Sequence, residues 1–176
     1  MKKSIKKPTK NLIKRFSVCS TVFIIILGTI LHFTYDWSKN NPIIGVFSAI
    51  NESTWEHLKL LFFPTLITTI IGYFYFKESS NFLCGKVIEV LVSMFFVVNV
   101  YYTYTGVLGK DVAWVNILIF ILAVIVGEIA NYLVLNSNIP CNKKVAVSIL
   151  ILLTVLFVVF TFNAPQRGLF QEPLKK

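Results

Sequence analysis

Five long runs of apolar residues, separated by short polar clusters, dominate the pattern of the chain. The runs cover residues 16–35, 57–76, 82–105, 112–135 and 145–162. A helix needs about 20 apolar residues to cross a hydrocarbon core about 30 Å thick, and each run approaches or exceeds that length. The pattern therefore predicts an all-α fold, an integral membrane bundle of about five transmembrane helices.

A shorter apolar piece, residues 43–50, lies between the first and second runs. Eight residues of helix rise only about 12 Å, so we expect this piece to be interfacial or re-entrant. Pro64 falls inside the second run. Because proline has no N–H and clashes with the preceding turn, it should kink this helix and free the carbonyl of Leu60.

The composition agrees with a membrane protein. Of the 176 residues, 56% are hydrophobic and 14% are charged, whereas soluble domains are nearer one quarter charged, so a water-soluble enzyme is excluded. The net charge is +9, but seven basic residues fall within residues 1–15, where there is no acid. This concentration indicates a tail beside the lipid bilayer and not a nucleic-acid partner. We therefore expect a basic cytoplasmic tail (1–15), a single transmembrane helical domain (16–162) and an extracytoplasmic C-terminal tail (163–176).

The basic residues also predict the orientation. With five spans and a cytoplasmic N-terminus in the cell membrane, eleven basic residues lie inside and six outside, as the positive-inside rule requires. The same topology places Cys19, Cys84 and Cys141 near cytoplasmic ends of spans, where we expect reduced thiols.

Polar and ionisable residues at two levels of the bundle are the candidates for function, because such residues are costly in a membrane. The outer level joins the end of the first span to the head of the second, and it holds His32, Asp36, Asn51, Glu52, Glu56 and His57. Imidazole and carboxylate together suit a divalent metal such as zinc. In this interpretation His32, Asp36 and His57 are the ligands, and Glu52 or Glu56 is a general base.

A structural interpretation of the same residues stays open. Ser53 and Glu56 have the spacing of a capping box, in which each side chain satisfies a free amide of the helix start. Lys59, three residues after Glu56, is a partner for its carboxylate. His32 would then be an interfacial histidine bonded to Asp36.

The inner level holds acids at equal depth in two neighbouring antiparallel spans. Glu89 and Glu128 each lie about 10 Å from the cytoplasmic end, and Asn99 and Asn131 extend their polar faces. These residues are either polar contacts between helices, with Lys86 as a partner of Glu89, or a relay for protons or cations.

A resemblance begins at the second span. The run Asn51-Glu52-Ser53-Thr54-Trp55-Glu56-His57-Leu58-Lys59-Leu60 resembles the signature of an uncharacterised family of small polytopic membrane proteins from Gram-positive bacteria, a domain of unknown function. The tail around Pro165 and Glu172 is similar to the family's tail, although Gly168 replaces a proline. The resemblance implies that the outer motifs form one assembly, so the predicted binding residues also include Trp55 and Glu172.

Two functions from different classes remain. The first is a non-enzymatic protein whose outer polar vestibule binds a small ligand, a cation or a partner helix. The second is a metal-dependent membrane-embedded hydrolase that acts on lipid-linked or peptide substrates with the same outer cluster.

Overall fold

Five long helices form the protein, as the apolar pattern predicts. The computed structural model describes residues 9–172, and within this range there is no strand. The helices are α1 (Lys10–Trp37), α2 (Pro42–Gly45), α3 (Thr54–Phe76), α4 (Phe82–Leu108), α5 (Ala113–Asn136) and α6 (Lys143–Phe162), followed by the 3₁₀ helix η1 (Gly168–Phe170). α1, α3, α4, α5 and α6 are long and apolar enough to cross a membrane, so the structure is that of an all-α multi-pass bundle.

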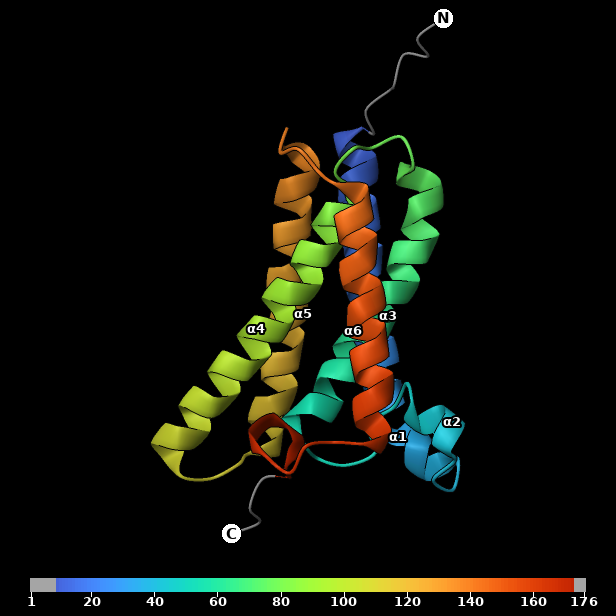
Figure 1. Cartoon of the computed structure of the whole chain (residues 1–176). Coiled ribbons are helices and arrows are strands. Elements are labelled where there is room, and N and C mark those ends of the chain that lie inside the picture. The colour runs from blue at the N-terminus through green and yellow to red at the C-terminus, as the bar shows by residue number, and fades with distance from the viewer. Residues whose placement is uncertain (1–8, 173–176) are drawn as a thin grey trace, which may run out of the picture.

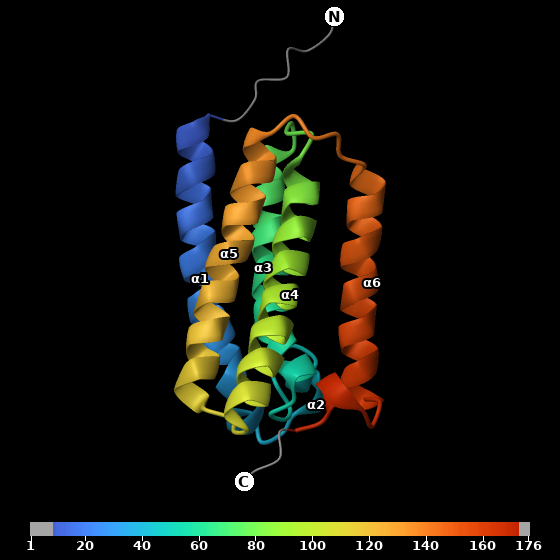
Figure 2. The same ribbon diagram turned by 90° about the vertical axis from the view of Figure 1, so that its left-hand side faces the viewer.

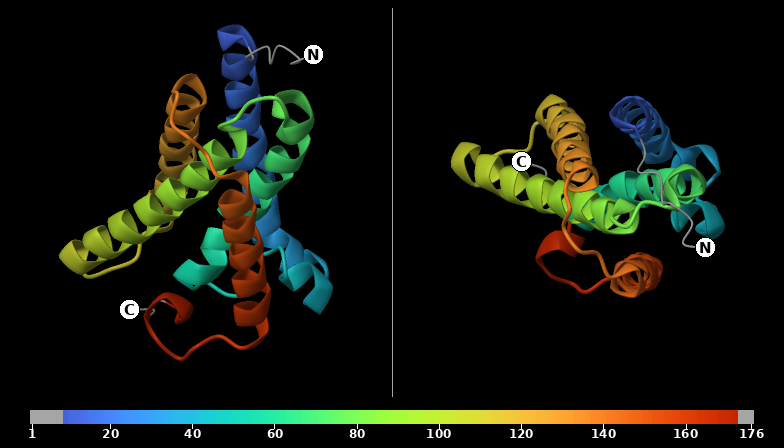
Figure 3. Two further views of the ribbon diagram at one scale, coloured as in Figure 1. Left: turned by 45° about the horizontal axis from the view of Figure 1, so that its top comes forward. Right: turned by 90° about the horizontal axis from the view of Figure 1, so that it is seen from above.

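The long helices alternate in direction, so their connections gather at the two ends of the bundle (Figures 1 and 2). One end, here the N-terminal end, carries the start of α1 and the α3–α4 and α5–α6 connections. The opposite end, here the C-terminal end, carries α2, the α4–α5 loop and η1. Seen along the bundle, α4 and α5 lie side by side, while α6 packs to one side (Figure 3).

The helices extend beyond the apolar runs because capping side chains, and not hydropathy, set where they begin. Thr9 accepts a hydrogen bond from the amide of Leu12, which starts α1 six residues before the predicted span. Asn142 accepts from the amides of Lys144 and Val145 at the start of α6. Each cap satisfies an amide that has no partner inside the helix.

Pro64 lies inside the continuous helix α3, and the carbonyl of Leu60 faces α1. A Cβ at Gly28 would lie 2.5 Å from the Leu60 oxygen and 2.6 Å from Cζ of Phe120. Glycine therefore allows α1 to approach both α3 and α5. This contact holds α1, α3 and α5 close together next to the outer polar residues.

The segment between α1 and α3 folds against the ends of both helices. The predicted apolar piece 43–50 forms only the four-residue α2 and a series of turns. Asn41 caps the start of α2, and the helix ends at Gly45. The hydroxyl of Ser48 bonds α1 through the carbonyl of Leu31 and the amide of Tyr35. The C-terminal tail returns to the same end, where the ring of Phe170 lies 4.9 Å from that of Trp55.

The prediction that all three cysteines are thiols is wrong for two of them. Cys84, at the start of α4, is bonded to Cys141 in the α5–α6 loop, and Cys19 is free and exposed on α1. The two paired residues meet because both lie at the N-terminal end, which the charge bias predicts to be cytoplasmic. Disulfides are typical of oxidising compartments, so this bond and the charge bias favour opposite orientations.

Candidate metal centre and pocket

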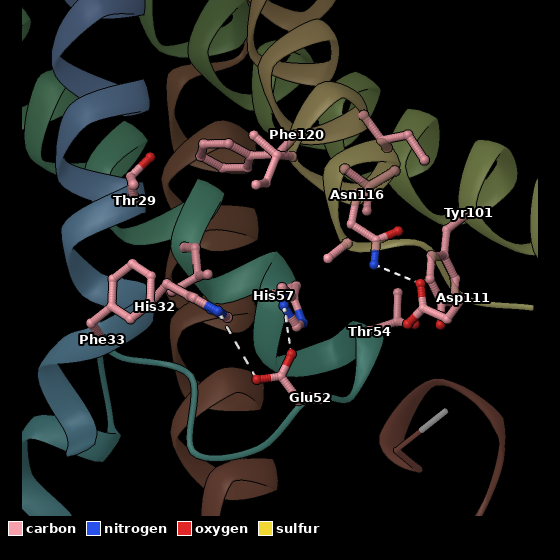
Figure 4. Close-up of a pocket in the computed structure, with 16 residues that line it drawn as sticks. Thr29, His32, Phe33, Glu52, Thr54, His57, Tyr101, Asp111, Asn116 and Phe120 are labelled. Carbon is pink, nitrogen blue, oxygen red and sulfur yellow. Dashed lines mark hydrogen bonds and ion pairs between the residues drawn. The ribbon is translucent and has the colours of Figure 1, made fainter. Parts of the chain in front are cut away.

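Two histidines and one glutamate converge at the C-terminal end of the bundle (Figure 4). Nε2 of His57 lies 3.5 Å from Oε2 of Glu52, and Nε2 of His32 lies 4.0 Å from Oε1 of the same carboxylate. The two imidazole rings are 5.2 Å apart. All three residues offer donor atoms within 4.8 Å of one another, a spacing at which they could hold one metal ion.

The three side chains come from two helices and the turn that precedes the second. His32 lies near the end of α1 and His57 in the first turn of α3, while Glu52 stands just before Ser53, the N-cap of α3. The side-chain oxygen of Asn51 accepts from the amide of Ser53 at 3.0 Å, which fixes this turn. The irregular segment thereby places a carboxylate between the histidines of neighbouring helices.

The hydrogen bond of His57 prepares its other nitrogen for a metal. Nδ1 lies 2.9 Å from the carbonyl oxygen of Ser53, and since a carbonyl only accepts, Nδ1 carries the proton. In the neutral ring this leaves the lone pair on Nε2, which faces Glu52. Such a bond to a backbone carbonyl is the usual second contact of a histidine ligand.

The separations also suit zinc. Ligand bonds of about 2.1 Å in a tetrahedron put donor atoms about 3.4 Å apart. The two histidine–glutamate separations, 3.5 Å to Oε2 and 4.0 Å to Oε1, are too long for strong direct hydrogen bonds, and a bound ion would draw the three donors, which lie within 4.8 Å of one another, closer to this spacing. Side-chain exposures of 29% for His32, 30% for His57 and 58% for Glu52 leave the cluster open to an entering ion.

The cluster forms one wall of a pocket of about 390 Å³. The opposite wall carries the polar residues Tyr101, Asp111 and Asn116, from α4, the α4–α5 loop and α5 (Figure 4). Between the two polar walls the lining is mostly apolar, with Phe33, Leu60, Val97, Ile117, Ile119 and Phe120. Pockets for small molecules commonly combine apolar walls with a few polar groups in this way.

Asp111 is held by its own hydrogen bonds. Its Oδ1 accepts from the hydroxyl of Tyr104 and from Nδ2 of Asn116, both at 2.7 Å. Neither Asp111 nor Tyr104 was predicted as a site residue from the sequence. The sequence signal that could have found Asp111 is its position in the α4–α5 loop, which the predicted topology puts on the same side of the membrane as His32 and His57.

Glu56, one of the two candidate bases, is not part of this cluster. Its buried carboxylate lies 2.5 Å from Nζ of Lys59 and accepts from the amide of Ile50 at 3.0 Å. Only half of the predicted capping box forms: Ser53 accepts from the amide of Glu56, but the amide of Ser53 bonds Asn51 instead. Lys59 also donates to the carbonyl of Gly45 and the hydroxyl of Thr161, so the ion pair ties α2, α3 and α6 together.

The remaining predicted outer residues lie apart from the pocket lining. Asp36, a predicted metal ligand, is exposed and is not among the three converging donors. Glu52, a predicted base, supplies the carboxylate of the cluster instead. Glu172 is exposed on the tail. Trp55 is buried against Phe157, Phe160 and Phe170, where it holds α6 and the tail to α3.

At the inner level, Glu89 and Glu128 both reach one lysine. Nζ of Lys86 lies 2.7 Å from Oε2 of Glu89 and 3.6 Å from Oε2 of Glu128. Asn131 donates to Glu128 at 2.9 Å. Asn99 does not join them: it is exposed and donates to the carbonyl of Phe95 on its own helix.

The chain belongs to a family of unknown function. Its sequence matches the DUF6512 model over residues 2–175, nearly the whole chain, which confirms the expected membership of a domain-of-unknown-function family. No curated protein and no solved structure matches it.

Proposed function

We propose that this protein binds a divalent cation, zinc by preference, through His32, Glu52 and His57, and that the adjoining pocket binds a small ligand on the outer face of the membrane. The observation that carries the proposal is the convergence of these three side chains within 4.8 Å. Two imidazoles and one carboxylate form a donor set that zinc binds well. The contact of His57 Nδ1 with the carbonyl oxygen of Ser53 at 2.9 Å supports the same role.

The pocket supports a ligand with two polar ends. A bound cation would present an electrophilic position at the first wall, and the carboxylate of Asp111 presents an acceptor at the second. The apolar residues between them would take up a hydrocarbon or aromatic middle. A ligand of this kind has a lone-pair donor at one end and a hydrogen-bond donor at the other.

Zinc-dependent stability of the purified protein tests the cation site. Zinc at about 100 times its dissociation constant should stabilise the folded protein by about 2.7 kcal/mol, and a chelator should remove this gain. His57→Ala should abolish the response. Asp36→Asn is the matched control, since it removes an exposed outer carboxylate that is not among the three donors; equal responses in wild type and His57→Ala would exclude the site.

A metal-dependent hydrolase is the second candidate. The observation that favours it is the small number of protein ligands, since three donors leave a fourth tetrahedral position for water, as in catalytic zinc sites. Glu56 is unsuited as the base because Lys59 and Ile50 engage its carboxylate. If Glu52 is a metal ligand, Asp111 is the other carboxylate that lines the pocket and the candidate for the general base. Zinc-loaded protein that hydrolyses lipid-linked or peptide substrates, with loss in His57→Ala, would establish the enzyme; zinc binding without hydrolysis would favour the binding vestibule.

The orientation remains part of the proposal. In the predicted topology eleven of the 17 basic residues of the sequence fall on the cytoplasmic side, which supports a cytoplasmic N-terminus in the cell membrane and an outer position for the His32–Glu52–His57 cluster.

A further inference from the structure

The inner polar cluster contains one basic group and two acidic groups. Lys86, Glu89 and Glu128 form the buried triad, and their side chains are 0%, 2% and 5% exposed. The other buried ion pair, Glu56 with Lys59, has one group of each sign. If all three groups of the triad were ionised, a net negative charge would remain inside the membrane domain, which is strongly unfavourable.

The helices around the triad supply no second cation. The ammonium of Lys86 donates to the hydroxyls of Ser20 on α1 and Thr68 on α3, both at 3.2 Å, and it lies 5.4 Å from the centre of the Phe16 ring. From α5, Asn131 donates to Glu128. Among the described residues, the hydrogen bonds and ion pairs of the triad involve no ionisable group from α1, α3 or α6, so these neighbours are neutral.

Two carboxylate oxygens of the triad have no hydrogen-bond partner. These are Oε1 of Glu89 and Oε2 of Glu128, both fully buried. Both carboxyl groups lie against the same ammonium, Oε2 of Glu89 at 2.7 Å and Oε2 of Glu128 at 3.6 Å from Nζ of Lys86, so they lie near each other. Two ionised carboxylates repel at such a distance, whereas one proton between them makes a donor and removes the excess charge.

We propose that the buried triad is a proton-binding site inside the membrane domain, in which Glu89 and Glu128 share one proton at neutral pH. A metal cation fits less well, because the ammonium of Lys86 already stands between the carboxylates. Glu89 makes the shorter contact to Lys86, 2.7 Å against 3.6 Å for Glu128, and the shared proton offsets the second carboxylate charge. This site is separate from the proposed metal centre and lies toward the opposite end of the bundle.

Infrared spectroscopy of the purified full-length protein in lipid nanodiscs tests the proton directly. A protonated carboxyl has a C=O band that is separate from those of carboxylates and amides. All eight acids of the chain lie in the described part, and Asp36, Glu52, Glu78, Asp111 and Glu172 are exposed. Wild type at neutral pH should therefore show one carboxylic acid per chain, and the band should decline as the pH is raised far into the alkaline range.

Two variants assign the band and one serves as the control. Glu128→Gln should remove it, and Glu89→Gln should remove it as well, because the remaining carboxylate then pairs with Lys86 alone. Glu78→Gln changes an exposed acid in the α3–α4 loop and should keep the band. The proposal is overturned if wild type shows no such band, or if the band persists in both triad variants. If either variant fails to fold, the other and the wild-type titration still decide.

Discussion

Replacing Glu56 by glutamine distinguishes two roles of this side chain, a partner in a capping box and one half of a buried ion pair. In a capping box glutamine can serve in place of glutamate, and the loss in unfolding free energy would be at most about 1 kcal/mol. The carboxylate of Glu56 is instead buried at 2.5 Å from the ammonium of Lys59, whose side chain is 0% exposed. Removing one partner of a buried pair costs about 3 to 5 kcal/mol, because the other charge stays buried without compensation. We therefore expect Glu56→Gln to lose about 3 to 5 kcal/mol.

Reversible unfolding in mixed micelles measures this loss, and a double variant shows its origin. Glu56→Gln with Lys59→Met removes both charges and should recover much of the stability, since an uncharged pair of similar volume avoids the desolvation cost. Glu78→Gln, an exposed acid, should stay within about 0.5 kcal/mol of wild type. A loss below about 1 kcal/mol for Glu56→Gln, or no recovery in the double variant, would refute the importance of the pair.

Three further predictions follow from packing, covalent structure and topology. Gly28→Ala should cost about 1 to 3 kcal/mol, because its Cβ would press on Leu60 and Phe120, whereas Gly106→Ala should have little effect since nothing lies within 4 Å of that position; thermal unfolding of both variants compares them. Cys141→Ser should lower stability by up to about 4 kcal/mol under non-reducing conditions, because the disulfide closes a loop with a sequence separation of 57, and reduction should bring wild type to the same value. In intact cells an impermeant thiol reagent should label Lys110→Cys and not Glu78→Cys; labelling only of Glu78→Cys would reverse the orientation and put the disulfide outside the cell.

The membrane helices could be predicted from the sequence because span length is a property of single segments. Five apolar runs gave five helices, and the errors at their ends came from caps such as Thr9 and Asn142, which hydropathy does not detect. The disulfide was missed because it depends on two distant segments, the start of α4 and the α5–α6 loop, meeting at one end.

The candidate site was predictable only in part, for a related reason. His32 and His57 lie at adjoining ends of consecutive spans, so a short connection brings them together. The choice between Asp36 and Glu52 depends on the path of the irregular segment before α3, which has no periodic pattern to read. Asp111 comes from a separate helical hairpin, and its place opposite the histidines follows from how α4 and α5 pack against α1 and α3.

X-ray absorption spectroscopy of the zinc-loaded protein tests the central claim most directly, since it reports the atoms that surround the metal. The proposed site predicts one zinc per chain with two imidazole nitrogens and at least one carboxylate oxygen at about 2.0 to 2.2 Å, and loss of one imidazole contribution in His32→Ala. Zinc with sulfur at about 2.3 Å, or with no imidazole, or no stoichiometric zinc at all would contradict a metal centre built from His32, Glu52 and His57.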